Sequence, residues 1–328
     1  MSDQRTQITV EQLDPLSPNT PLVYVIILNY NGAQITLDCV RSVPNLDYPN
    51  FRVLVVDNAS KDDSGVVLAE GIRAIDDSRI ELLLNERNEG YAGGNNRGID
   101  KALAAGAEYI LALNNDIIAV PGSLAPLVDA MERDRTIGVC GCPIVNFGYE
   151  SDPNLGQGIS LYTGITSHWP HGRDTCQAVD VDYICGAAIM FRAEMLRQIG
   201  MFDARFFLLC EDSDICFRAR KSGYRVCFVP GPGVRHHMSQ TMSRHRPLTT
   251  FVATRNKVWF IRRHGTLAHR FVFNLLSFFY FYPKAILGRI FRRQFDLLQP
   301  LLRGIWEGHW KYPGSYARTA RATQDLRG

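Results

Sequence analysis

Three carboxylates stand within four positions of the sequence, at Glu211, Asp212 and Asp214, directly after the apolar run 206–209. Helix capping accounts for one or two acids in a first turn, but three exceed what capping needs. A carboxylate at the mouth of a pocket is also what a general base requires. The sequence therefore indicates a candidate centre for proton transfer among these three acids.

A second polar group interrupts the apolar run Ile110–Val120 at Asn114, Asn115 and Asp116. A carboxylate inside one continuous buried strand would be costly unless it were paired or coordinated. The less costly interpretation ends the strand at Leu113. The three polar residues then lie just past a strand's carboxyl end, which is where open α/β sheets bind their ligands.

Asp116 is the expected direct ligand of a hard divalent cation that keeps several waters and binds substrate phosphates. The segment Val234–Met238 contains two histidines, and either His236 or His237 could complete a metal site with Asp116. A single histidine is more often structural, so this assignment depends on the other polar groups.

Polar side chains also follow two other predicted strands. Asn29, Tyr30 and Asn31 follow the first strand, and Asp57 follows the second. Side chains at two adjacent strand ends can hydrogen-bond the base and ribose of a nucleotide, and Asp57 suits a ribose hydroxyl or a base N–H. Helix capping by Asn31, Asp57 or Ser60 is the alternative interpretation.

The segment Asn88–Gly98 resembles a glycine-rich turn that leads into a helix and lets backbone N–H groups approach an anion. It matches neither a Walker A sequence nor the G-x-G-x-x-G spacing of dinucleotide-binding folds. We expect Asn88, Gly90, Gly93 and Asn95 to lie against the bound nucleotide ligand. A turn with a close packing contact is the alternative.

The elements that must position these residues alternate along the first 145 residues. Apolar runs of strand length are Leu22–Leu28, Val53–Val56, Ile80–Leu84, Tyr109–Leu113 and Ile137–Cys142, and the helix-length segments are 33–43, 61–74, 92–105 and 122–133. Strands that are apolar on both faces and alternate with helices predict an α/β fold with a mostly parallel sheet flanked by helices.

The pattern changes after residue 145. Residues 146–178 are rich in Gly, Pro, Asp and His, which predicts loops or short antiparallel strands near a site. The later elements are predicted as a strand over Val181–Arg192, a helix over Asp212–Lys221, a strand over Arg225–Pro230, and helices over Thr250–His264 and from about Thr266 to Arg293.

The carboxyl-terminal part is basic and aromatic. The formal net charge of the chain is +3, yet the residues from Met242 onward hold 16 Lys and Arg against 3 Asp and Glu, leaving 20 against 30 before them. The aromatic run Phe271–Pro283 is too short for a clear membrane span, and Arg and Lys flank it. This composition favours a helix in a membrane interface, and a core helix or a helix against a second subunit is the alternative. Aromatics that gather in one stretch argue against nucleic-acid binding.

The expected organisation has three parts: a polar arm over residues 1–20, a catalytic domain over 21–265, and a helical segment over 266–328 that associates with membrane or forms oligomers. The eight cysteines show no C-x-x-C spacing, which favours buried thiols in a reducing compartment and argues against zinc. No secretory signal is recognised at the amino terminus. We therefore expect a cytoplasmic protein on the inner face of the cell membrane.

Together, the ordered segments resemble the inverting family 2 glycosyltransferases of GT-A fold, and particularly the bacterial rhamnosyltransferase-like branch. The matching segments are Val23–Asn31, Tyr48–Ser60, Asn88–Gly98, Leu113–Asp116, Phe206–Arg218, Gly223-Tyr224 and Arg255-Asn256. They occur in the family's order and cover about residues 22–260.

The resemblance implies roles for individual residues. Asp57 corresponds to the acid that contacts the donor nucleotide, and Asp116 to the metal-holding acid of the family's D-x-D, whose first acid is replaced by Asn114. Glu211-Asp212 corresponds to the family's E-D pair, with Asp212 as the catalytic base. Three further parts of the chain would then lie near the metal–diphosphate group or the acceptor: the segment with Asn115, the histidine His236, and the pair Arg255-Asn256. The cation would be Mg²⁺ or Mn²⁺.

The implied activity is inverting transfer of a sugar from a nucleotide-diphosphate donor to a glycan or lipid-linked acceptor of the cell surface. Rhamnose from dTDP-rhamnose is the first expectation, ahead of UDP-hexoses and UDP-galactofuranose. A nucleotidyltransferase and a non-catalytic nucleotide-sugar-binding scaffold are the alternatives. A homo-oligomer is also compatible with the sequence.

Overall fold

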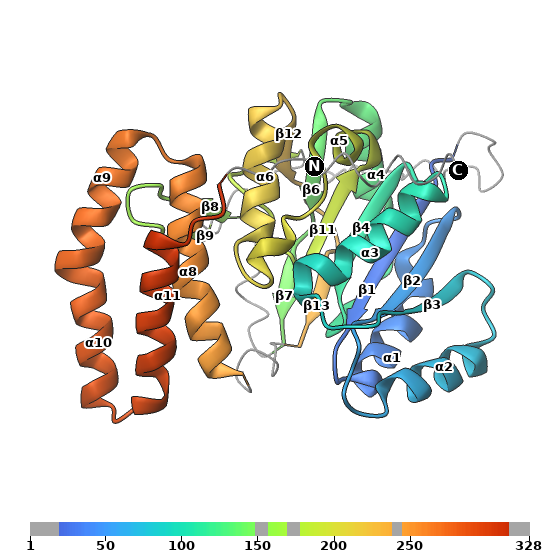
Figure 1. The fold of residues 1–328 in the computed structure, drawn as a ribbon. Coiled ribbons are helices and arrows are strands. Elements are labelled where there is room, and N and C mark those ends of the chain that lie inside the picture. The colour runs from blue at the N-terminus through green and yellow to red at the C-terminus, as the bar shows by residue number, and fades with distance from the viewer. Residues whose placement is uncertain (1–19, 148–156, 169–177, 238–244, 315–328) are drawn as a thin grey trace, which may run out of the picture.

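The computed structural model describes residues 20–147, 157–168, 178–237 and 245–314. Its centre is an eight-stranded sheet with the order β10-β12-β6-β11-β4-β1-β2-β3 (Figure 1). Four adjacent parallel strands form one half of it: β1 (Val23–Asn29), β2 (Phe51–Asp57), β3 (Ile80–Leu84) and β4 (Tyr109–Asn114). Because these strands are parallel neighbours, the polar residues at their carboxyl ends meet at one edge of the sheet.

The other half of the sheet contains one reversed strand. It consists of β11 (Ala188–Arg192), β6 (Ile137–Gly141), β12 (Arg225–Phe228) and β10 (Val179–Asp180). Strand β11 lies antiparallel between β4 and β6, while β6 and β12 are parallel. The reversal brings the chain just before β11 to the edge where the carboxyl end of β4 lies, since Ala188 pairs with Leu113.

Helices cover both faces of the sheet. The apolar core on one face includes side chains from α1 (Ala33–Ser42), α2 (Ser64–Ile75) and α4 (Ala125–Arg133), and that on the other includes side chains from α3 (Gly90–Ala104), α5 (Ala193–Ile199) and α6 (Glu211–Lys221). Successive residues of β1 contribute alternately to the two cores, so the strand is apolar on both faces, as a covered parallel strand must be.

Two small sheets and two short helices complete the catalytic region. One sheet joins β5 (Ile117–Ala119), β13 (Val234–His236) and β7 (Ile144–Asn146), and the other joins β8 (Gln157–Ile159) to β9 (Thr166–His168). The short 3₁₀ helices are η1 (Val43–Leu46) and η2 (Ala204–Phe206). The register of β13 places His236 opposite Ile117 on one side and Asn146 on the other.

The carboxyl-terminal helices form a layer beside the sheet (Figure 1). They are α8 (Arg246–His264), α9 (Leu267–Leu276), a π-helical stretch η3 (Ser277–Phe281), α10 (Tyr282–Phe291), η4 (Phe295–Leu297) and α11 (Leu298–Trp310). Helix α11 packs closely on α8, because a Cβ at Gly304 would lie 2.7 Å from the Phe251 carbonyl oxygen and one at Gly308 would lie 2.9 Å from Val258 Cβ.

Most of the predicted elements are present, and one prediction was wrong in part. Within Val181–Arg192 only Ala188–Arg192 is a strand, because the preceding residues bend toward the sheet edge and carry Gly186 to the acidic cluster. Strand β4 ends at Asn114, one residue later than predicted. The polar arm lies outside the described residues except for Thr20, and so do parts of 146–178.

Candidate active site

The ends of β1 and β2 are joined by a hydrogen-bonded pair. Asn29 Nδ2 donates to Asp57 Oδ1 at 2.7 Å, and both side chains are almost fully buried. The Ser60 hydroxyl donates to the same carboxylate oxygen and accepts from the backbone N–H of Asn31. Tyr30 and Asn31 form the turn after β1, with Asn31 at φ +54°. Asp57 is therefore fixed in place at the strand end.

Asn115 extends this network toward β4. Its Nδ2 donates to the Thr36 hydroxyl at 2.9 Å, and that hydroxyl donates to Asn29 Oδ1 at 2.8 Å. Asn114, at the end of β4, donates its backbone N–H to the Ala187 carbonyl. The polar residues after β1, β2 and β4 thus belong to one connected arrangement, as the sequence predicted.

The glycine-rich segment packs closely against the loop before α6. Gly90 has φ +72°, and a Cβ there would lie 2.4 Å from the Phe207 carbonyl oxygen, so only glycine fits. The Asn88 side chain accepts from the Gly90 N–H at 2.8 Å and from Asn58 Nδ2 at 3.0 Å. These contacts favour the packing interpretation of the glycines.

Two residues of the same segment, Asn95 and Gly93, are enclosed by neighbouring groups of the protein. Asn95 is buried and its Nδ2 donates to the Tyr91 carbonyl within α3. Gly93 lies beside Glu89, whose carboxylate pairs with Arg97. In this conformation neither residue offers a polar side chain to a donor.

Asp116 and His236 meet across β5 and β13. Asp116 Oδ1 lies 3.2 Å from His236 Nε2, both atoms are buried, and neither has a hydrogen-bond partner among the described residues. On the far side of the ring, Nδ1 donates to Asn146 Oδ1 at 3.1 Å. With the proton on Nδ1, as a metal-bound imidazole has it, Nε2 would present its lone pair to a cation held between the ring and the carboxylate.

This pair fits a divalent cation. Two ligands about 2.1 Å from one ion in octahedral geometry lie about 3 Å apart, which is close to the observed spacing. The outer hydrogen bond from Nδ1 is typical of metal-binding histidines. Since no cluster of three or more His, Cys, Asp or Glu occurs in the described part of the chain, waters and substrate phosphates would have to supply the other ligands.

His237 lies on the other side of the strand from this pair. Its ring stacks on Phe147 with the centroids 3.8 Å apart, and its backbone N–H donates to the Asp116 carbonyl. Of the two histidines, His236 is the one that contacts the Asp116 carboxylate.

Asp212 and Glu211 begin α6 in different surroundings. Asp212 accepts hydrogen bonds from the backbone N–H groups of Gly186 at 3.1 Å and Ser213 at 2.6 Å. Burial raises the pKa of Asp212, although these hydrogen bonds oppose the rise. Burial and the neighbouring charge of Asp212 raise the pKa of Glu211 well above its ordinary value, and Glu211 Oε2 has no partner among the described residues. Of the two carboxyls, Glu211 is the one whose pKa is raised further.

Asp214 has a structural role. It is fully buried and accepts from Arg218 and Arg263 at 2.8 Å, and its Oδ1 lies 2.8 Å from His264 Nε2. Although burial opposes ionisation, the hydrogen bond from His264 and the charges of the two arginines lower the pKa of Asp214. The third acid of the cluster thus links α6 to the end of α8.

The loop before α6 is strained and is held by one amide. Phe207, Leu209 and Cys210 all have φ near +70°, which is unfavourable for residues with a side chain. The buried Asn256 donates from Nδ2 to the carbonyls of Phe206, Leu208 and Leu209 at 2.8–2.9 Å. Helix α8 therefore fixes the path of the chain into Asp212.

Arg255 supports the same loop and does not face the carboxylates. Its guanidinium stacks on Trp259, 4.2 Å from the ring centroid, and donates to the carbonyls of Arg205 and Phe206. The predicted contact of Arg255 with the donor stays a prediction, and the structure shows it beneath the loop.

Sequence reasoning missed Tyr91, Gly186 and Asn146. The Tyr91 hydroxyl donates to the Gly186 carbonyl, and burial together with the charges of Glu211, Asp212 and Asp116 raises its pKa. Gly186 also donates to Asp212, and its neighbour Ala187 accepts from Asn114 at the end of β4, so Asp212 and the segment that leads to Asp116 lie at one edge of the sheet. Only the pairing of distant strands reveals these contacts, although Tyr91 lies inside the glycine-rich segment.

With this geometry in view, comparison with known proteins decides the family. Residues 24–200 match the family model described as glycosyl transferase family 2. The chain belongs to this family. This family 2 glycosyltransferase is 26% identical over 238 residues to the N-acetylglucosaminyl-diphospho-decaprenol L-rhamnosyltransferase of Mycobacterium tuberculosis, covering 63% of this chain and 76% of the relative. It is 24% identical over 241 residues to rhamnosyltransferase WbbL of Escherichia coli K12, covering 66% and 83%.

Solved structures show the same GT-A fold. The mannosyltransferase PcManGT from Pyrobaculum calidifontis, in complex with GDP-Man and Mn²⁺, matches with a TM-score of 0.57 and 16% identity, covering 91% of this glycosyltransferase and 89% of that chain. GalNAc-T7 with UDP, GalNAc and Mn²⁺ matches with a TM-score of 0.58 and 18% identity, covering 75% and 48%. The second comparison spans about half of the larger protein.

Proposed function

We propose that this glycosyltransferase moves a sugar, with rhamnose as the first candidate, from a nucleotide-diphosphate donor to a hydroxyl of a lipid-linked or glycan acceptor, with inversion at the anomeric carbon. The observation that carries the proposal is that Gly186 and Ala187 contact both Asp212 and the end of β4 that leads into the Asp116–His236 pair. Relatives named rhamnosyltransferase favour a rhamnosyl donor.

In this proposal Asp57 and Asn29 hold the nucleoside end of the donor, and Asp116 and His236 hold Mg²⁺ or Mn²⁺ beside its diphosphate. A bound cation would neutralise charge that develops on the leaving diphosphate. The mixed carboxylate–imidazole pair suits Mn²⁺ better than Mg²⁺, which prefers oxygen ligands. Structural neighbours were crystallised with Mn²⁺, which is consistent with this choice.

Asp212 is proposed as the general base. Its Oδ1 accepts from both the backbone N–H and the hydroxyl of Ser213, whereas its Oδ2 accepts one backbone N–H, from Gly186, and keeps a second lone pair for the acceptor proton. Because the pKa of Glu211 is raised further, Asp212 is the member of the pair that ionises first. Asp212 would take the proton of the acceptor hydroxyl as the new bond to the anomeric carbon forms on the face opposite the leaving diphosphate.

A binding screen tests the donor and the cation together. Thermal shift and calorimetry with dTDP, UDP, GDP and their sugar conjugates, with and without Mn²⁺, should show metal-dependent stabilisation by one nucleotide series, about 2.7 kcal/mol at 100-fold above the dissociation constant. Asn146→Leu should weaken the Mn²⁺ response by about 10–100-fold, because His236 loses the acceptor that orients it. Silence of the wild-type protein across the panel would favour a non-catalytic scaffold.

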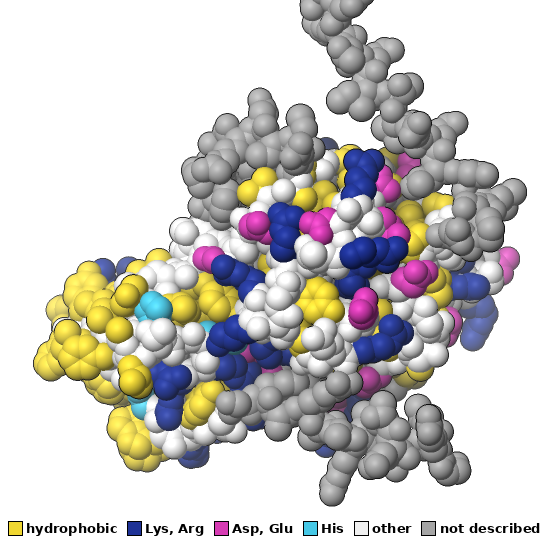
Figure 2. All heavy atoms as spheres, turned by 90° about the horizontal axis from the view of Figure 1, so that it is seen from above, with side chains coloured by type: hydrophobic (Ala, Val, Ile, Leu, Met, Phe, Trp, Pro, Cys, Tyr) yellow, Lys and Arg dark blue, Asp and Glu magenta, His cyan; other side chains and the backbone are white. Residues whose placement is uncertain are grey.

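We also propose that α9–α10 places the enzyme on the inner face of the cell membrane. Within the described residues, Leu267–Phe291 is the one helix whose length, 25 residues, and mean hydropathy, 1.3, would allow a membrane span, and 11% of its apolar window is buried. Leu267, Phe271, Phe279 and Phe291 are 70–82% exposed. Figure 2 shows apolar side chains gathered at the end of the molecule formed by these helices. A lipid-linked acceptor would be reached from such a position.

A further inference from the structure

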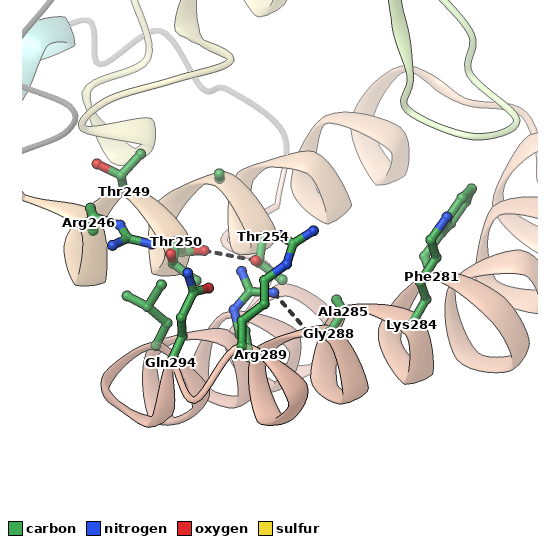
Figure 3. A pocket seen from close by; sticks show the side chains of 13 residues that line it. Arg246, Thr249, Thr250, Thr254, Phe281, Lys284, Ala285, Gly288, Arg289 and Gln294 are labelled. Atoms are coloured by element: carbon green, nitrogen blue, oxygen red, sulfur yellow. Dashed lines mark hydrogen bonds between the residues drawn. The ribbon is translucent and has the colours of Figure 1, made fainter.

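A cavity of about 790 Å³ lies between the first half of α8 and α10 (Figure 3). Thirteen side chains line it, and none of them is acidic. Its cationic residues are Arg246, Lys284, Arg289 and Arg292, and three threonines and Gln294 add hydroxyl and amide groups. A cavity with this lining has the charge and the hydrogen-bond donors to hold an anion.

The cations of this cavity are not neutralised by the protein. Within the described residues none of the four forms an ion pair with a carboxylate, although Arg303 on the neighbouring helix α11 pairs with Glu307. Arg289 Nη1 donates to the Ala285 carbonyl at 3.0 Å, but its Nε is buried and has no hydrogen-bond partner in the described part of the chain. A buried guanidinium donor without an acceptor is costly, and a bound anion would supply that acceptor.

Two of the guanidiniums lie near each other. Figure 3 shows Arg246 at the start of α8 beside Thr250, and Arg289 on α10, where its hydrogen bond runs back to the Ala285 carbonyl. Burial and the charge of Arg246 together lower the pKa of Arg289, so the two cations repel each other in the folded protein. An oxyanion between them would convert this repulsion into two charge-assisted hydrogen bonds.

The position of the cavity indicates what carries the anion. It opens on α10, whose other side chains include the exposed Leu287, Ile290 and Phe291. A ligand with an apolar chain attached to its phosphate would therefore contact both the cationic cavity and the apolar helix surface. In Figure 1 the Arg246 end of α8 lies on the same side of the molecule as the start of α1, which is the sheet edge that holds the candidate active site.

We propose that this cavity binds the phosphate or diphosphate group of a membrane lipid. The inference deepens the proposed function, since it rests on the membrane position proposed for α9–α10, and it assigns the recognition of the lipid head group to this cavity. A free phosphate has the same chemistry, so the experiment separates the two sources.

Gly288→Glu is the decisive variant. A Cβ at Gly288 meets no atom within 4 Å, so the glutamate fits and its carboxylate can occupy the anion position beside Arg289. The variant should unfold at the same or a higher temperature than the wild type, because the new charge pairs with the unneutralised arginines. Its folding can therefore be verified while its anion site is blocked.

The readout is binding of the full chain to phosphatidylcholine vesicles, with and without a minor fraction of phosphatidic acid, whose head group is a phosphate monoester. The wild type should prefer the vesicles with phosphatidic acid, inorganic pyrophosphate should compete, and Gly288→Glu should reduce the preference by about ten-fold, as expected for one charge-assisted contact. Arg133→Gln, which changes the net charge equally at an 84% exposed side chain on α4, should bind like the wild type.

Two results would overturn the proposal. If Gly288→Glu binds phosphatidic acid vesicles as the wild type does, the cavity does not hold the lipid head group. If, in that case, pyrophosphate raises the unfolding temperature of the wild type but not of Gly288→Glu, the cavity is a site for free phosphate. If Arg133→Gln loses as much binding as Gly288→Glu, the attraction is a general effect of net charge. Binding of nucleotide and Mn²⁺ by the same variants reports separately on the proposed transferase site and should be unchanged.

Discussion

Asp212 and Glu211 are adjacent in sequence but differ in what they can do. Both begin α6, yet Asp212 receives two backbone N–H groups and Glu211 Oε2 receives none among the described residues. When two buried carboxyls lie side by side, the negative charge of one raises the pKa of the other. The carboxyl that accepts more hydrogen bonds loses its proton first. This asymmetry supports the proposal that Asp212 is the base.

Asp212→Asn should reduce kcat by about 10²–10⁴-fold, because a positioned general base contributes that much to transfer rates. Affinity for nucleotide and Mn²⁺ should stay within two-fold of the wild type (about 0.4 kcal/mol), since Asp57 and Asp116 are untouched. Burial raises the pKa of Asp212, so the acid limb of the wild-type kcat/KM profile should lie above the ordinary aspartate pKa of about 3.9. Wild-type turnover in the variant would disprove the assignment of the base.

Glu211→Gln should stabilise the protein at neutral pH. The pKa of Glu211 is raised in the folded state, so the folded protein binds the proton more tightly than the unfolded chain. The wild type therefore loses stability as pH rises from the unfolded pKa, about 4.3, toward the folded one, and glutamine removes that loss. Denaturant unfolding at several pH values should show a gain that grows with pH. Parallel curves for the two proteins would contradict a raised pKa.

At the scale of elements, α8 is the support of the catalytic loop. Asn256 holds three carbonyls of the strained segment before α6, while Arg263 and His264 pair with Asp214 inside α6. A segment with positive φ at ordinary residues persists only when its surroundings hold it. Helix α8, which lies well beyond α6 in the sequence, is therefore part of the site's construction.

Asn256→Leu should lower kcat with little change in affinity for nucleotide and Mn²⁺. The substitution removes the donor to three carbonyls, which should cost about 1–3 kcal/mol of stability and let the loop relax. Leu68→Ala, a core truncation in α2, should lose about 2–5 kcal/mol and retain kcat in the folded protein. Equal losses of turnover in the two variants would show that Asn256 acts only through global stability.

The sequence predicts the central elements well because their burial is visible in the chain. Strands β1, β2 and β4 are continuous apolar runs, and the polar residues at their ends signal the site edge. Helix α11 lies in the segment 266–328 that was predicted to be helical, but its bounds were not predicted, because Pro300, Gly304 and Gly308 lower its helix propensity. The two glycines instead allow close contact with α8, which only the tertiary structure shows.

The sequence predicts which types of residue form the candidate site, but it does not predict which of them contact one another. Asp116 and His236 are 120 positions apart, and the register of β5 with β13 is what joins them. Asn146, which orients the histidine, carries no sequence signal, because it depends on the pairing of β13 with β7. Conversely, Asn95 and Arg255 have suitable chemistry, but packing directs them to backbone carbonyls.

At the scale of the whole molecule, the apolar surface of α9–α10 is separate from the catalytic edge and can be altered alone. Phe271→Ser with Phe279→Ser should reduce vesicle binding by at least about ten-fold, since burial of one phenylalanine contributes about 1.5–3 kcal/mol. The thermal unfolding temperature should not fall, because these side chains are 70% and 80% exposed. Val66→Ser with Leu84→Ser removes comparably exposed apolar side chains elsewhere and should leave vesicle binding unchanged.

The outcome also separates a membrane surface from a subunit interface. If the two phenylalanine substitutions shift an oligomer to monomer in sedimentation equilibrium and leave vesicle binding intact, the surface joins copies of the chain. Loss of vesicle binding by a protein whose mass in solution is unchanged supports membrane attachment.

Helix α8 contacts both the catalytic loop and the proposed lipid site. Its Asn256 holds the loop before α6, and its first half lines the cavity together with α10. Two ligands that act on one shared element are thermodynamically coupled, and such coupling is reciprocal. Any factor by which a lipid surface tightens substrate binding through α8 is therefore the factor by which substrate tightens attachment to that surface. An enzyme built in this way would remain longest on membranes that carry its acceptor.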